Sequence, residues 1–442
     1  MKKTLLSLSL ISIAFAAKAQ SWVSQATGFD TASRGLTQIQ IVDANTVWGL
    51  AFDGATTTNI VQEFTRTTDG GSNWTPGTID VGDTNKEINS ISAVNGQTAW
   101  VSALVGADGN GVIYKTSNGG ATWTQQNASG YSTTGSSFLN GVYFFNANNG
   151  VAYGDPVGTE FEVYTTSNGG TTWTPVLVAN IPNPASGEYG YNAIPTVAGG
   201  VLWFTTNKGK LYKTTDMGIT WTKLNTPLTD FGATAVNGKV FFSDANNGYI
   251  LGTSDSGTTY KLYKTTNGGT TWDAGTVYTG YRLMTCVPNT SILVACGAGT
   301  SSGGTGSAYS INGGTTWTSI DTGAQRLSPS FLNPTTGWCG GFSSDPFTGG
   351  VFKFSGALSV SNTTNPKSFK IYPNPAISSV TISSETAELE NVIITDLTGK
   401  IIKQKTLNGV ENNLDISDLS SGAYFFTVKG NSISETIKVM KN

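Results

Sequence analysis

The sequence predicts an all-β protein, a seven-bladed β-propeller followed by a small Ig-like β-sandwich. Three observations predict this fold class: a low share of charged residues, an internal repeat of about 50 residues, and a change of composition after residue 356. Of the 442 residues, 12% are charged and 55 are Gly. In soluble domains about 25% of the residues are usually charged. This composition disfavours coiled coils and long surface helices.

Several classes of chemistry are excluded by composition. The chain contains no histidine, which removes Ser-His-Asp and Cys-His nucleophiles and HExxH zinc sites. The net charge of −3 provides no basic field for phosphate backbones, so we expect no nucleic-acid partner. We also expect no cofactor and no metal.

Residues 1–19 are predicted to be a signal peptide. Lys2 and Lys3 form the charged start, an apolar run covers residues 5–17, and Ala17-Lys18-Ala19 is a cleavage pattern. The apolar run is shorter than the roughly 20 residues that a membrane span needs. We expect the mature chain to begin at Gln20 and to contain no transmembrane segment.

A short template recurs six times and ends each time in tryptophan. Its acidic or amide positions are Asp69, Asn118, Asn168, Asp216, Asn267 and Asn312, and its tryptophans are Trp74, Trp123, Trp173, Trp221, Trp272 and Trp317. The tryptophans are 49, 50, 48, 51 and 45 residues apart, and a period near 50 between strand-rich segments indicates propeller blades. We expect structural roles: the Asp or Asn accepts backbone N–H groups in the turn, the glycines adopt positive φ, and the Trp packs between blades.

The two ends of the repeat region are predicted to join. The strand pair within residues 327–354 has no template after it, and Ser21-Trp22-Val23 resembles the strand that follows each template. Trp22 lies 52 residues before Trp74, which fits the period. The first strand should therefore complete the seventh blade and leave no unpaired strand edge at the closure.

The template resembles the Asp-box, or BNR repeat, of seven-bladed propellers. That group includes sialidases, xyloglucan-cleaving enzymes, sortilin-type receptors and photosystem II assembly factors. The resemblance implies the propeller fold for residues 20–356. It does not imply one activity, because these relatives perform different functions.

Residues 357–366 are predicted to be a linker, and residues 367–442 a separate β-sandwich domain. The second segment contains Tyr372-Pro373-Asn374-Pro375, Asp396 followed by Gly399-Lys400, and Leu419-Ser420-Ser421-Gly422 before Tyr424. In this order the motifs resemble the C-terminal sorting domain of the type IX (Por) secretion system of Bacteroidetes. The resemblance implies recognition by that machinery after periplasmic transit, and a secreted or outer-membrane-attached location. The alternative is an adhesion module that stays on the protein.

Candidate ligand-binding residues come from loops at one end of the blades. Arg34, Arg282 and Arg326 lie within two residues of the first apolar residue of an inner strand, and Lys86 holds the matching place in the second blade. Clustered guanidinium groups would bind a carboxylate or another anion. The equally weighted alternative is separate solvated cations, or partners for nearby acids.

Acids and aromatics complete the candidate set. The loops between second and third strands carry Asp53, Asp155 and Asp345, together with Asp108 and Asp255, and for these turn formation is the favoured role. The loops before inner strands carry Tyr189, Tyr191 and Tyr281, together with Tyr131 and Phe231, which could serve as platforms for a sugar ring or a protein.

The favoured function is binding of a glycan, peptide or surface polymer outside the cell. The alternative is a secreted sialidase-like glycoside hydrolase acting through carboxylates and tyrosine. Against it, the segment around Arg34 reads Thr31-Ala32-Ser33-Arg34-Gly35 and lacks the F-R-I-P-like signature. Of Cys286, Cys296 and Cys339, the first two could form a hairpin disulfide, but three buried thiols are favoured.

Overall fold

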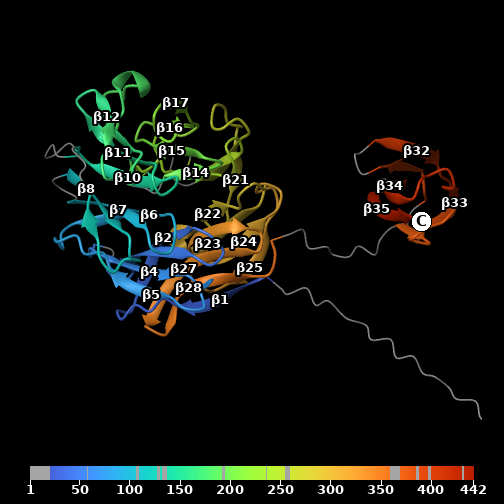
Figure 1. Ribbon diagram of the computed structural model, residues 1–442, viewed down its shortest axis with the longest axis horizontal. Coiled ribbons are helices and arrows are strands. Elements are labelled where there is room, and N and C mark those ends of the chain that lie inside the picture. Colours follow the sequence, from blue (N-terminus) through green and yellow to red (C-terminus); the bar gives the residue numbers. More distant parts are fainter. Residues whose placement is uncertain are drawn as a thin grey trace, which may run out of the picture. The chain divides into compact units, whose positions relative to one another are not determined.

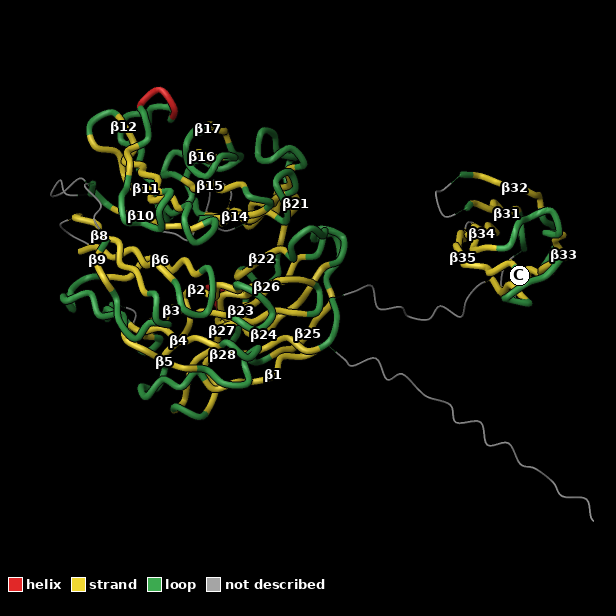
Figure 2. The backbone as a smooth tube through the Cα atoms, viewed as in Figure 1, coloured by secondary structure: helices red, strands yellow, loops and turns green. Residues whose placement is uncertain are grey.

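The computed structural model describes residues 20–442 except 57, 106–108, 127–129, 132–136, 192–194, 235, 254–258, 359–368, 385–387, 397–399 and 431–432. The predicted signal peptide and most of the predicted linker therefore lie outside the described residues. The chain divides into two compact units, residues 1–359 and 360–442. Strands run through both units, and helix is confined to the short 3-10 turns η1 (Val178–Asn180) and η2 (Thr300–Ser302) in the described part (Figure 2).

The described strands of the first unit form seven four-stranded antiparallel groups, the blades. Five are separate sheets, and the first and seventh blades meet in one eight-stranded sheet through the pair Gly35–Phe342. The strands of blades 1 to 3 are β2 (Arg34–Ile41), β3 (Val47–Asp53), β4 (Glu63–Thr67) and β5 (Thr75–Thr78); β6 (Glu87–Ala93), β7 (Ala99–Val105), β8 (Gly109–Thr116) and β9 (Thr124–Gln125); β10 (Leu139–Phe144), β11 (Gly150–Val157), β12 (Glu160–Thr166) and β13 (Thr174–Pro175).

The remaining blades follow the same pattern in chain order. The strands of blades 4 to 7 are β14 (Thr196–Ala198), β15 (Val201–Thr205), β16 (Lys210–Thr214) and β17 (Thr222–Asn225); β18 (Gly238–Phe242), β19 (Gly248–Thr253), β20 (Tyr260–Thr265) and β21 (Thr276–Tyr278); β22 (Leu283–Cys286), β23 (Leu293–Gly299), β24 (Gly304–Ser310) and β25 (Thr318–Thr322); β26 (Leu327–Asn333), β27 (Thr336–Asp345), β28 (Thr348–Ser355) and β1 (Ser21–Ala26). The last blade thus takes its outer strand from the start of the described chain.

Strand β1 closes the structure as the sequence predicted. It pairs antiparallel with β28 over its whole length, with Trp22 opposite Phe354, and Figure 1 shows the blue β1 beside the orange β28. The Trp22 ring packs edge-on against Phe331 and Phe354 at 5.9 and 5.4 Å, and its Nε1 donates to Ser307 Oγ of blade 6 at 2.8 Å.

The hydrophobic core lies between blades. Trp48 and Phe64 of blade 1 pack with Ile91 and Val101 of blade 2, and clusters of the same kind join each consecutive pair of blades, including the seventh to the first. Where the sheet of one blade packs against the sheet of the next, water is excluded from the two facing surfaces. The blades therefore form a closed ring, with the first strand of each blade innermost.

Polar side chains join neighbouring inner strands. Gln38 donates to Ile91 O at 2.8 Å and accepts from Ile91 N at 3.0 Å, and Gln40 makes the same pair of bonds with Ala93. An amide side chain carries both a donor and an acceptor, so it can replace a missing strand neighbour. These bonds satisfy inner-strand backbone groups that face the gap between blades.

The six template turns have the structural role that the sequence predicted. In each, the side-chain oxygen of the Asp or Asn accepts the backbone N–H four residues later at 2.9–3.0 Å. Five turns have two glycines with φ between 66° and 92°. The tryptophans pack against the clusters between blades.

The three cysteines are buried and unpaired. Cys286 packs in the cluster shared with blade 5, whereas Cys296 packs with Cys339 in the cluster shared with blade 7. The possible Cys286–Cys296 disulfide is therefore wrong, because the two side chains lie on opposite faces of blade 6. The favoured interpretation, buried thiols, is confirmed.

The second unit is a β-sandwich. One sheet contains β29 (Phe369–Tyr372), β30 (Ser379–Ser384) and β33 (Glu411–Asp415); the other contains β31 (Asn391–Thr395), β32 (Ile401–Thr406), β34 (Gly422–Gly430) and β35 (Ile433–Lys441). Alternate residues of β30 and β31 are buried, and both sheets contribute to one apolar cluster around Ile382, Ile394 and Phe426. Alternation of this kind is expected when one face of each sheet packs on the other.

Candidate ligand site in the central channel

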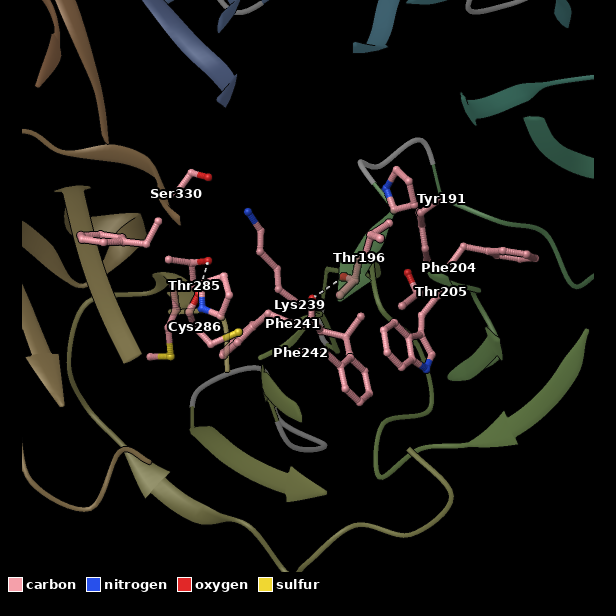
Figure 3. A pocket seen from close by; sticks show the side chains of 18 of the residues that line it. Tyr191, Thr196, Phe204, Thr205, Lys239, Phe241, Phe242, Thr285, Cys286 and Ser330 are labelled. Carbon is pink, nitrogen blue, oxygen red and sulfur yellow. Dashed lines mark hydrogen bonds between the residues drawn. The ribbon is translucent and has the colours of Figure 1, made fainter. Parts of the chain in front are cut away.

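The strongest candidate site is a cavity in the central channel. It has a volume of about 430 Å³ and is lined by the inner strands β14, β18, β22 and β26, together with residues of β15 and the segment before β14. Cavities that bind small molecules begin at about 300 Å³. Most of the residues that line it are aromatic or aliphatic, but polar atoms make up about half of its surface. The side chains of Thr205 and Ser330 are among the polar ones (Figure 3).

An aromatic pair extends from the cavity to the solvent. Tyr191 lines the cavity, and its ring packs edge-on against Tyr189 with 5.7 Å between ring centres. Tyr189 is 44% exposed. Asp155 accepts the backbone N–H of Gly190, between the two tyrosines, at 2.9 Å. The structure thus brings together three residues of the candidate set: Asp155, Tyr189 and Tyr191.

The loop that carries the aromatic pair is held by a buried carboxylate. The Glu188 side chain is fully buried and contacts Lys223 Nζ at 2.7 Å, Thr206 Oγ1 at 2.9 Å and the Ala185 backbone N–H at 2.7 Å. These contacts hold the buried carboxylate in place, because a movement that broke the ion pair or the hydrogen bonds would leave its charge uncompensated. Glu188 was missed in the sequence, where no pattern distinguishes it from a surface acid.

Burial and hydrogen bonding determine the protonation of this region. Tyr191 donates its hydroxyl to Asp230, and burial together with this carboxylate raises the pKa of Tyr191. Burial also raises the pKa of Asp155, although bonds from Asn140 and Gly190 act in the opposite direction. A raised tyrosine pKa favours the neutral phenol, which suits a contact surface rather than a nucleophile.

Lys239 is a second residue that sequence reasoning missed. It lies in β18, and its side chain extends into the open channel (Figure 3). It directly precedes Val240, so the positional rule that selects the arginines and Lys86 also applies to Lys239. The other residues that line the cavity carry no charge.

The three candidate arginines each have their own partners. Arg34 contacts Glu63 at 2.9 Å and Asp53 at 3.5 Å. Arg326 contacts Asp321 at 2.7 Å, and its guanidinium lies 3.9 Å from the Phe352 ring centre. These contacts of Arg34 and Arg326 match the alternative interpretation, in which the arginines are partners for nearby acids. A shared anion site stays a prediction.

Arg282 and the other basic and aromatic candidates make local contacts. Arg282 lies over the Tyr260 ring at 4.2 Å and donates to Ser301 O. Lys86 is 3.4 Å from the Tyr114 hydroxyl, and Tyr281 donates to Thr305 O at 3.2 Å. None of these contacts by itself builds a site.

The acidic loop candidates mostly shape turns. Asp53 accepts the backbone N–H groups of Ala55 and Thr56, and Asp345 accepts that of Phe347, as the favoured turn interpretation predicts. Asp108 and Asp255 lie outside the described residues.

Two of the expected aromatic platforms are wrong. Tyr131 and Phe231 are only 1% and 5% exposed, so neither presents a face to solvent. Tyr131 donates its hydroxyl to Glu162 O and packs in the cluster between blades 2 and 3. Both rings therefore contribute to packing between blades.

Comparison with protein families identifies the second unit. Residues 370–442 match the model described as the secretion system C-terminal sorting domain. This segment is a type IX sorting domain. The sorting domain indicates export through the type IX machinery to the cell surface or the extracellular space, and the described residues contain no helix long and apolar enough to cross a membrane.

Solved structures that are similar to this chain include two YCF48 proteins and PorZ. YCF48 from Cyanidioschyzon merolae is 17% identical with a TM-score of 0.50, over 76% of this chain and 99% of that one. A YCF48 bound to D1 peptide is 14% identical with a TM-score of 0.48, over 78% and 99%. PorZ, a type IX surface component of Porphyromonas gingivalis, is 14% identical with a TM-score of 0.39, over 94% and 60%. No curated protein matches the sequence.

Proposed function

We propose that the exported propeller is a binding protein that takes a glycan, a peptide or a surface polymer at its central channel. The observation that carries this proposal is the cavity of about 430 Å³ with Tyr191 in its wall and the exposed Tyr189 beside it. Aromatic rings beside a cavity of mixed polar and apolar surface supply contact area, and the polar groups can orient a ligand. The sorting domain brings this surface to the cell exterior.

A glycoside hydrolase is less well supported. Such an enzyme needs a pair of free carboxyl groups across the substrate, about 5–10 Å apart. Asp155 and Asp230 near the channel are both engaged, with Gly190 and Tyr191 respectively, and Arg34 and Arg326 are paired with acids. These contacts favour binding without turnover.

The proposal is tested by screening the exported full-length protein on glycan and peptide arrays. Tyr189→Ala should weaken binding to the selected ligand at least about tenfold, because it removes an exposed aromatic contact without touching the core. Val277→Ala is the matched control: Val277 is 65% exposed on the outer strand β21 and should leave the affinity unchanged. Equal effects of both substitutions, or release of a cleaved product, would refute a binding role for the channel.

A further inference from the structure

Lys239 lies inside the ring and has no partner among the described residues. It lies in β18 among neutral residues of five blades, and its side chain reaches the open space of the channel (Figure 3). Within the described residues no carboxylate, carbonyl or hydroxyl lies within hydrogen-bonding distance of its ammonium group. Water reaches the group, yet the surrounding protein weakens its solvation, which lowers the pKa of Lys239.

Three other lysines of the ring have hydrogen-bonding or ion-pair partners. Lys115 donates to Gly169 O at 3.0 Å, Lys353 to Gly70 O at 2.7 Å, and Lys223 contacts Glu188. Lys239 is exposed to the water of the channel, and the three donors of its ammonium group make no hydrogen bond with the described residues, so they are available to a ligand. Lys239 differs in this from the three lysines named above.

We propose that the Lys239 ammonium group binds a carboxylate of the ligand inside the channel, while the Tyr191–Tyr189 pair contacts the rest of that ligand. This inference rests on the proposed function. One cation among uncharged walls balances one negative charge, which suits a carboxylate. The hydroxyls of Thr205 and Ser330 line the same cavity and supply further donors. The carboxylate belongs to an acidic sugar residue or to the C-terminus of a peptide.

The experiment uses the full-length exported protein and two matched pairs of small probes. Glucuronate is compared with glucose, and N-acetyl-dialanine with its C-terminal amide, by calorimetric titration. We expect the acidic member of one pair to bind at least tenfold more tightly than its neutral partner, and the pair that shows the difference identifies the source of the carboxylate.

Variants test whether Lys239 carries that preference. Lys239→Met should abolish the difference between acid and neutral probe, and Lys239→Arg should retain part of it. Lys208→Met is the control, because Lys208 is an exposed lysine in the turn after β15 and does not line the cavity. With isotope-labelled lysine, the Lys239 side-chain resonance should shift with the acidic probe only.

Two readouts separate this inference from its alternatives. A purely structural lysine would make Lys239→Met less thermally stable, whereas we expect the unliganded variant to melt at the same or a higher temperature. Equal binding of acid and neutral probes, or no binding of either acid by the wild type, overturns the inference. If the array ligand still binds Lys239→Met normally but not Tyr189→Ala, the proposed function stands and the carboxylate contact falls.

Discussion

The fourth template turn shows how one residue responds to its neighbour in the next blade. In the other five turns the first glycine lies under or beside a Lys, Arg or Tyr side chain from the preceding blade. The fourth turn has Met217 at this position, with φ of 61°. The preceding blade there carries Thr165, where most blades carry Lys or Arg. A short neighbour leaves room for a side chain, although the left-handed backbone remains unfavourable.

Met217→Gly should therefore stabilise the protein. Relief of the left-handed strain outweighs the extra freedom of Gly in the unfolded chain, so the free energy of unfolding should rise by about 0.5–1 kcal/mol. Gly268→Met is the reciprocal change, and it should cost about 2 kcal/mol or more, since a Cβ there would meet Lys213 Nζ at 2.4 Å and Ala245 O at 2.8 Å. Denaturant titration measures both, and a destabilised Met217→Gly would contradict the account.

At the scale of elements, the closure strand β1 matters most. It is the outer strand of blade 7, and it also reaches blade 6 through the bond from Trp22 to Ser307. Gln25 Oε1 accepts from Trp74 and Trp338, so the same strand contacts blade 1. One six-residue strand thus connects three blades, which explains why the ring needs its first and last segments together.

Trp22→Ala should lower the free energy of unfolding by about 2–4 kcal/mol, because it removes a ring that packs on two phenylalanines and leaves Ser307 without its donor. Val23→Ala, one residue along the same strand and 50% exposed, should stay within about 0.5 kcal/mol of the wild type. Thermal and denaturant unfolding measure the difference. Equal stabilities would show that β1 is dispensable for closure.

At the scale of the whole molecule, the proposed binding site and the sorting domain lie in different units. Each unit has its own core: the described clusters of the ring are shared between blades, and the sandwich has one cluster of its own. Few contacts cross between independent domains, so loss of one leaves the other folded.

Deletion of residues 360–442 should therefore block export without unfolding the ring. The truncated protein should accumulate in the periplasm and keep the melting temperature of the ring in the full chain. Cell fractionation locates the protein and circular dichroism gives the melting temperature. Appearance of the truncated protein at the cell surface would refute the dependence on the sorting domain.

Local patterns in the sequence were sufficient for the repeat, the closure and the sorting domain. Each repeat carries its own turn chemistry, with Asp69 or Asn118 in the turn and Trp74 or Trp123 after it, and these interactions act over a few residues. The motifs of the last 76 residues are likewise contiguous. The turns and the sorting motifs could be predicted because the residues that form each one are close in sequence. The closure pairs Trp22 with Phe354, and it was predicted from the period of the repeat instead.

Only the tertiary structure decided which side chains form a site. Arg34 and Arg326 contact acids 29 and 5 residues away, Tyr131 packs between blades 2 and 3, and Lys239 has no partner in the channel among the described residues. Neighbouring inner strands come from repeats about 50 residues apart, and the direction of each side chain depends on which neighbour it meets across the gap. A charge is free or paired according to those long-range contacts, since burial and electrostatic compensation are properties of the assembled ring.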